Sequence, residues 1–239
     1  MSFNHNQHPG ASEEIKALLA AALLLLAWGF ALVSWARAQK LAPTTTPAII
    51  TPPPGNAAFL VGHAVGTQGY VCLPTSTGAS WTVNASRPEA TLFAGVAGHE
   101  VQIINHYLSP DSNPNELAPK PLPFGSATWQ SSLDGSKVWG QTLNAIPAGS
   151  DPSCPNAGAI ACLLLQSIGS QQGPAGGKIM TRTAFIKRLN TQGGSAPAAG
   201  CSVAADVGKQ TLVPYTADYY FFGRTNKSLK TKTTRFEFH

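Results

Sequence analysis

The chain has 239 residues, of which only 11% are charged, and it contains 23 glycines and 19 prolines. Coiled coils and helical bundles need charged surfaces and few helix breakers, so this composition argues against both. Whole-chain disorder is also excluded, because 43% of the residues are hydrophobic and can bury a core. Residues 39–222 are almost neutral, and the net charge of +5 comes mainly from the C-terminal tail. A nucleic-acid-binding domain normally has a basic face on the fold itself, so no nucleic-acid partner is predicted.

The N-terminal region is typical of a secretory signal. An uncharged run, ALLAAALLLLAWGFALVSW, spans residues 17–35 and follows Lys16. The next three residues, 36–38, have the A-x-A pattern that precedes signal cleavage. We therefore predict a signal peptide over residues 1–38 and a secreted or cell-envelope protein after it. The run is also long enough to span a bilayer, so membrane association through an uncleaved anchor at residues 17–35 is the alternative.

A linker is predicted next, over residues 39–56. The stretch from Leu41 to Asn56 reads LAPTTTPAIITPPPGN, with five prolines and four threonines. This composition favours an extended, polyproline-like spacer that cannot build a core. The folded domain is therefore expected over residues 57–222, and a basic tail over residues 223–239.

The domain itself consists of short segments of β-branched, aromatic and alternating residues, separated by Gly, Pro, Asn or Ser. No segment after the N-terminal run has a helical period with caps. Asp134-Gly135 is a hairpin signal, because glycine tolerates the positive φ that a tight turn needs. We predict a single all-β domain, an antiparallel β-sandwich or barrel. The predicted strands are 57–65, 68–73, 80–85, 91–94, 100–108, 127–131, 137–145, 161–167, 177–190 and 215–222.

The cysteines agree with export. Four of them, an even number, predict two disulfides in an oxidising compartment, and three connectivities are open. Cys154 and Cys162 enclose a short loop with Pro and Gly, which favours their pairing. Cys72 and Cys201 would then join distant parts of the domain. Zinc binding is the alternative, but the chain has no C-x-x-C and the spacing between Cys154 and Cys162 is poor for a zinc site.

Several motifs resemble the domain-of-unknown-function family 3455. They occur in the family's order and extend along nearly the whole domain. The resemblance implies a small exported protein, of a kind found in bacteria and fungi, without an established activity. It also implies that Cys72 and Cys201 have counterparts in the family, whereas Cys154 and Cys162 are additions of this chain. The motifs are FLVGHAVGTQGYVC (59–72), HY (106–107), Trp129 with DGSKV (134–138), LLLQ (163–166), IKRLNTQGGSAPAAGC (186–201) and VPYTADYYFF (213–222).

Candidate ligand-binding residues come from these motifs. His63 and His106 are a workable ligand set if they converge with Glu100 or Asp134, but a hydrogen-bonding role for each histidine in a half-buried strand is the favoured interpretation. Tyr70 and Trp129 have rings of the kind that stack on sugars, line apolar pockets or build the core. The predicted function is therefore a binding module for a small molecule or a glycan. No spacing selects a metal, so no cofactor is predicted.

Two other functions stay open at this point. A structural cell-surface protein would suit the spacer and the membrane-anchor alternative. A hydrolase would need a histidine site or a carboxylate pair such as Glu100 and Asp134. The chain has neither G-x-S-x-G nor H-E-x-x-H, so no catalytic residue is predicted. The sequence indicates no oligomeric state.

Overall fold

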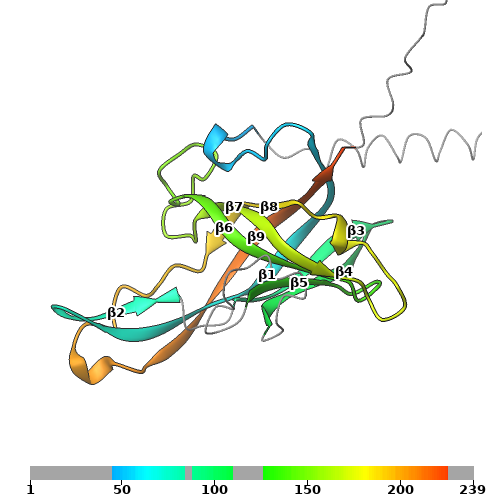
Figure 1. The fold of residues 1–239 in the computed structure, drawn as a ribbon. Helices are drawn as coiled ribbons and strands as arrows, with labels where there is room; N and C mark the ends of the chain where they lie inside the picture. The colour runs from blue at the N-terminus through cyan, green and yellow to red at the C-terminus, as the bar shows by residue number, and fades with distance from the viewer. Residues whose placement is uncertain (1–44, 84–87, 110–125, 226–239) are drawn as a thin grey trace, which may run out of the picture. The chain divides into compact units, whose positions relative to one another are not determined.

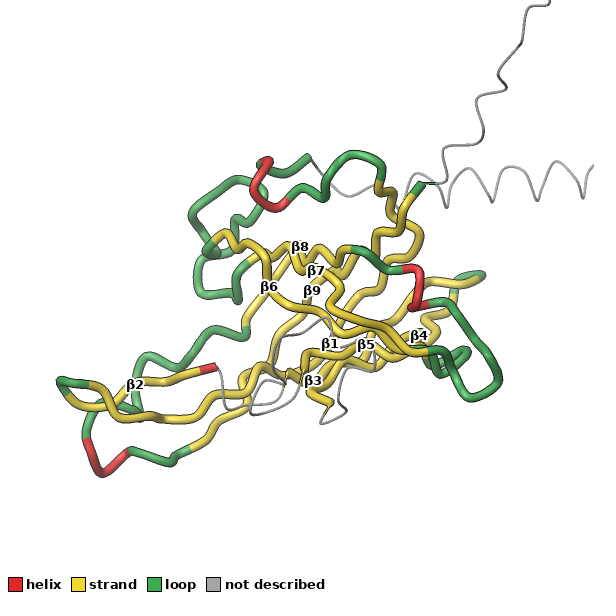
Figure 2. Tube along the Cα trace, viewed as in Figure 1, coloured by secondary structure: helices red, strands yellow, loops and turns green. Residues whose placement is uncertain are grey.

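The computed structural model describes residues 45–83, 88–109 and 126–225. Strands dominate this part of the chain (Figure 1), and Figure 2 shows that helix is confined to short turns. The prediction of an all-β domain is therefore confirmed. The strands are β1 (Asn56–Thr75), β2 (Gly78–Thr82), β3 (Pro88–Val96), β4 (His99–Ser109), β5 (Ser126–Ser131), β6 (Lys137–Ile146), β7 (Cys162–Gln171), β8 (Phe185–Gly193) and β9 (Gln210–Arg224), and the 3-10 turns are η1 (Ala48–Ile50), η3 (Met180–Arg182) and η4 (Ala204–Asp206).

All nine strands belong to one antiparallel sheet that closes on itself. From β3 to β9 each strand pairs with the next along the chain, β1 pairs with β3, and β9 returns to pair with β1. The ring of β1 and β3–β9 corresponds to the barrel among the two predicted architectures. Strands predicted at 57–65 and 68–73 are one strand, β1, of 20 residues. Gly66 does not break it, because the missing side chain lets the Glu89 backbone approach closely.

β2 and the adjoining ends of β1 and β9 extend beyond the ring (Figure 1). We call residues 69–83 and 199–213 the arm. Within it the Cys72 N–H donates to the Lys209 carbonyl at 2.8 Å, and the Ala79 N–H donates to the Ser202 carbonyl at 3.3 Å. A disulfide between Cys72 and Cys201 crosslinks the two segments. One covalent bond and a few hydrogen bonds therefore hold together parts of the chain that are 129 residues apart.

Side chains that alternate inward along the strands fill the ring. A second hydrophobic cluster lies outside it, where β6–β9 are covered by η1 and the segment after β6. The inner cluster contains Ala64, Leu92, Ile104, Trp129, Val138, Leu165, Ile186, Ala217, Tyr219 and Phe221, and the outer cluster contains Ile50, Ile146, Cys154, Cys162, Leu164, Leu189, Tyr220 and Phe222.

Part of the predicted linker belongs to the outer cluster. Ile50 is completely buried in it, and the Thr46 hydroxyl accepts a hydrogen bond from Lys187 Nζ at 2.7 Å. The composition predicted a spacer that contributes nothing to a core, and for residues 45–50 this is wrong. One isoleucine and one threonine are enough to anchor the segment, and neither stands out in a Pro- and Thr-rich stretch.

Shortening the Ile50 side chain tests this anchoring. We expect Ile50→Val to lower the free energy of unfolding by about 1 kcal/mol, because the lost methyl leaves a small void in an enclosed site. Ile49 is 51% exposed, so Ile49→Val is the matched control and should change stability by less than about 0.5 kcal/mol. Denaturant unfolding followed by tryptophan fluorescence measures both. Equal effects of the two substitutions would contradict the anchoring.

The strand predicted over 177–190 begins later than expected, at Phe185. Two backbone donors of the preceding loop bond to side chains of the β5–β6 turn, whereas the Ala184 N–H, directly before the strand, donates to the Phe222 carbonyl of β9 at 2.7 Å. The Ile179 N–H donates to Asp134 Oδ2 at 2.9 Å, and the Met180 N–H donates to Ser136 Oγ at 3.0 Å. The turn itself is the predicted hairpin, with a positive φ of 71° at Gly135.

The predicted signal peptide or membrane anchor, residues 1–38, lies outside the described residues. So do residues 39–44 of the linker and the basic tail from residue 226 onward. In the described ranges, no helix is both long enough and apolar enough to cross a membrane.

Candidate functional site

The five predicted ligand-binding residues do not form one site. Tyr70, His106 and Trp129 are buried on the inner side of the sheet. His63 lies on the outer side, and Asp134 lies in the turn between β5 and β6. His63 and Tyr70 are an odd number of residues apart on β1, so strand alternation directs them to opposite faces.

An aromatic cluster occupies the interior of the ring. The ring of His106 stacks on that of Trp129, with centroids 4.2 Å apart and planes 7° from parallel, and Tyr219 lies 5.6 Å and 5.8 Å from the two. His106 Nδ1 lies 2.9 Å from the Thr128 carbonyl, which can only accept, so Nδ1 holds the proton and Nε2 the lone pair. Burial lowers the pKa of His106 to about 4, and the ring is therefore neutral at neutral pH.

Arg188 lies on the same inner side, beside Tyr219 of the neighbouring strand. Only 9% of its surface is exposed, and its Nε and Nη2 donate to the Ala161 carbonyl at 3.0 and 2.8 Å. Burial raises the pKa of Tyr70 and of Tyr215, and the positive charge of Arg188 opposes this rise at both.

On the outer face, a histidine, an aspartate and an asparagine form a hydrogen-bonded array. His63 Nδ1 lies 2.9 Å from Asp218 Oδ1, and Asn190 Nδ2 donates to Asp218 Oδ2 at 2.7 Å. Asn190 is in the left-handed region, with φ 52°, at an irregularity of the β8–β9 pairing. The array links β1, β8 and β9 and leaves about half of the His63 side chain exposed.

Asp134 is held in place by its own turn. Its Oδ1 accepts from the N–H of Ser136 at 3.1 Å and from the hydroxyl of Ser136 at 2.7 Å, and its Oδ2 accepts from Ile179. Burial alone would raise the pKa of Asp134, but these hydrogen bonds lower it to about 2. Its carboxylate thus connects two loops. Nowhere in the described part of the chain do three His, Cys, Asp or Glu side chains gather as metal ligands.

A hollow of about 430 Å³ lies over β1, β3 and β4. We call it the trough, and it is lined by residues 65–67, 89–91 and 105–107. Ala64 and His106 point inward, so the residues that alternate with them along the strands face outward. These outward residues of the lining are Val65, Thr67, Thr91, Asn105 and Tyr107. The trough is therefore on the outer surface of the ring.

Hydrogen bonds orient two of the polar side chains in the trough. Tyr107 donates its hydroxyl hydrogen to Gln130 Oε1 at 2.7 Å. Asn105 Oδ1 accepts from Gln102 Nε2 at 2.9 Å. These neighbours on the outer face of the sheet hold a phenol ring and an amide at the rim of the hollow in defined orientations.

A model of the family described as "Protein of unknown function (DUF3455)" matches residues 53–223. The chain belongs to this family. The resemblance inferred from the motifs is thereby confirmed, and the interior cluster, Arg188 and the trough all fall inside the matched residues of the DUF3455 domain. No curated protein and no solved structure matches the chain.

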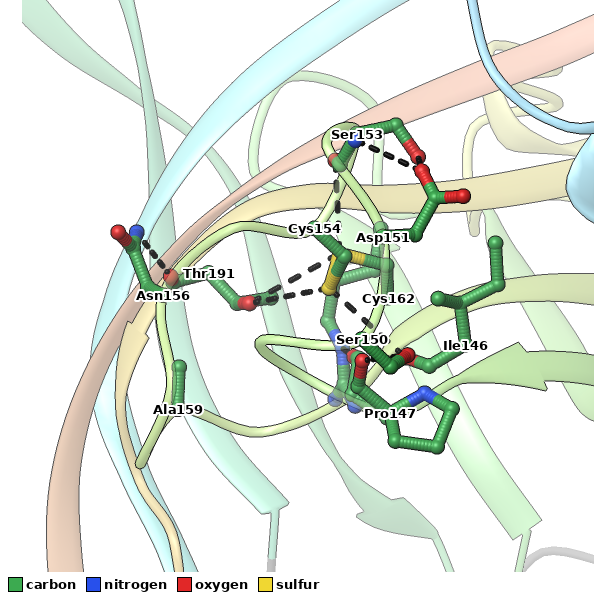
Figure 3. The surroundings of a disulfide bond; sticks show 12 residues. Ile146, Pro147, Ser150, Asp151, Ser153, Cys154, Asn156, Ala159, Cys162 and Thr191 are labelled. Atoms are coloured by element: carbon green, nitrogen blue, oxygen red, sulfur yellow. Dashed lines mark hydrogen bonds between the residues drawn. A yellow bond between two sulfur atoms is a disulfide. The ribbon is translucent and has the colours of Figure 1, made fainter.

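Both expected disulfides are present in the DUF3455 domain. The Cys154–Cys162 pair is buried in the outer cluster, with the Thr191 hydroxyl 4.0 and 3.9 Å from its two sulfurs (Figure 3). Cys72–Cys201 is the second pair, so the local pairing favoured by the loop sequence is confirmed. Two disulfides indicate an oxidising, extracytoplasmic environment for the domain.

Sequence reasoning missed Arg188 and Asp218. The K-R pair at 187–188 was a usable signal, because consecutive residues of a strand face opposite sides and a central strand must then bury at least one cation. Asp218 had no such signal, since its partners on β1 and β8 are 155 and 28 residues away.

Proposed function

We propose that this DUF3455 domain is a binding module for glycans and that the trough is its binding site. The observation that carries the proposal is the trough itself, an outward hollow of about 430 Å³ with hydroxyl, amide and phenol groups on three adjacent strands. Its volume lies within the range of small-molecule sites, roughly 300–1,000 Å³.

The chemistry of the lining suits a sugar. Thr67 and Thr91 have hydroxyls that both donate and accept, and Asn105 has an amide that does the same. Sugar hydroxyls need such two-way partners. The ring of Tyr107 supplies the flat, partly apolar surface on which a sugar ring can pack.

Prior orientation of these groups favours binding. The hydrogen bond from Tyr107 to Gln130 and the one from Gln102 to Asn105 restrict the side chains before a ligand arrives. Side chains that are already ordered lose less conformational entropy on binding. An oxidising compartment, indicated by the disulfides, is also where surface glycans are met.

An array of β-glucan, chitin and peptidoglycan oligosaccharides, followed by calorimetry of any binder, tests the proposal. We expect Asn105→Ala and Tyr107→Ala each to weaken binding about tenfold, equal to about 1.4 kcal/mol. Thr142→Ala is the matched control, because Thr142 is an exposed residue of β6, a strand that does not line the trough. Absence of any binder, or unchanged affinity in both trough variants, would overturn the proposal.

A further inference from the structure

Two consecutive cations of β8, Lys187 and Arg188, are buried on opposite sides of the sheet. Lys187 faces the outer cluster, where its Nζ donates to Thr46 and lies 5.8 Å from the ring centre of Phe222. Burial lowers the pKa of Lys187. The guanidinium of Arg188 stays protonated, and therefore positively charged, at any ordinary pH.

The charge of Arg188 is not balanced within the described part of the chain. The ion pairs found there are His63 with Asp218 and Lys209 with Asp206, and neither includes Arg188. Buried charges are normally paired, because taking an ion out of water costs several kcal/mol. One backbone carbonyl, that of Ala161, accepts both of its hydrogen bonds.

The guanidinium retains unused donors at this position. Two of its five N–H groups point to Ala161, and no described acceptor takes the other three. The Arg188 side chain that holds these donors is nine-tenths buried, with 9% of the residue's surface exposed.

Neutral polar groups lie on the same inner side of the sheet as Arg188. The Tyr70 hydroxyl donates to the Gly194 carbonyl at 2.6 Å, and the hydroxyls of Tyr215 and Tyr219 lie 3.2 Å apart. His106, also under the influence of the Arg188 charge, is neutral at neutral pH. The inner side of the sheet thus holds a buried, positively charged guanidinium together with neutral hydrogen-bonding groups.

We propose that Arg188 is the anchor of a second binding site, on the inner side of the sheet, for a ligand with a carboxylate or phosphate group. A planar guanidinium binds such oxyanions through two parallel hydrogen bonds, and burial strengthens the interaction. The site is independent of the glycan trough, because it lies on the inner side of the sheet and on a different strand. Either site can therefore fail without affecting the other.

Anion titrations of the oxidised protein test the site. Sodium phosphate, sodium acetate and sodium chloride are added at equal ionic strength, and the Arg188 Nε–H signal is followed by nitrogen-15 NMR. The Nε–H signal of Arg182 is the internal control, because Arg182 is exposed in η3. We expect phosphate or acetate, or both, to shift the Arg188 signal saturably, with chloride having no such effect. A response to phosphate alone assigns a phosphate ligand, and one to acetate alone assigns a carboxylate.

A variant provides the second readout. Arg188→Gln should weaken binding of the effective anion at least tenfold, whereas Arg182→Gln should leave it unchanged. The NMR experiment needs no variant, so the test stands even if Arg188→Gln does not fold. The proposal is overturned if neither phosphate nor acetate gives a saturable shift at Arg188, or if a folded Arg188→Gln protein binds as well as the wild type.

Discussion

Removing the Cys72–Cys201 disulfide by a double substitution to alanine is expected to lower the free energy of unfolding by about 5 kcal/mol. The two cysteines are 129 residues apart, and a crosslink that closes so long a loop removes much of the conformational entropy of the unfolded chain. Its loss therefore stabilises the unfolded state. In the native state the arm would also lose the only covalent link between its two segments among the described residues.

Cys154→Ala with Cys162→Ala is the natural comparison, because those cysteines are only eight residues apart. The same entropy relation gives about 2.5 kcal/mol for so short a loop. Guanidinium unfolding of both double variants, without reductant, measures the difference. Limited proteolysis gives a second readout that does not depend on full unfolding, since cleavage within residues 199–209 should become faster when Cys72–Cys201 is absent. Equal stability losses together with an unchanged cleavage rate would contradict this account of the arm.

The free energy of unfolding should fall by about 3 kcal/mol as the pH falls from about 6.5 to 4, because of His106. The pKa of His106 is about 4 in the folded domain and about 6.5 when the chain is unfolded, since burial beside Trp129 disfavours the charged ring. Between these values the unfolded chain binds the proton and the folded domain does not. Stability is therefore fully present above pH 6.5 and is lost as the pH falls toward 4.

His106→Phe isolates this effect, because it retains a ring against Trp129 but has no group that titrates. Unfolding by urea at several pH values should show the decline in the wild type and a flat profile in the variant between pH 6.5 and 4. Asp134, with a pKa lowered to about 2, contributes stability that is lost below about pH 4, outside this window. An identical decline in the variant would show that His106 is not the group responsible.

Much of the fold was predicted from the sequence because the residue patterns that mark a strand lie within the strand and at its ends. Alternation of residues and turn formers at their ends predicted nearly every strand, and Asp134-Gly135 predicted the hairpin that the structure has at that point. Errors arose where a distant partner decides the conformation. Gly66 accommodates β3 and does not end β1. The N–H groups of Ile179 and Met180 bond to Asp134 and Ser136, so this segment does not extend β8.

For the candidate site, too, local signals identified suitable residues, but distant partners decided where their side chains lie. His106, Trp129 and Tyr70 were chosen for their chemistry, and the structure places all three on the inner side of the sheet. His63 and Asp134 were grouped with them but lie elsewhere, since one faces outward and the other supports a turn. Convergence of side chains depends on which strands are neighbours, and that information is not local.

The sequence by itself determined the class of the domain, its membership of the DUF3455 family and its content of two disulfides. These properties follow from residue types and short-range spacing. Only the tertiary structure decided that the sheet closes into a ring, that Ile50 of the predicted linker joins the core, and that Arg188 is buried without a counter-charge in the described part of the chain. Each of these depends on contacts between segments far apart in the chain, which form only when the sheet is assembled.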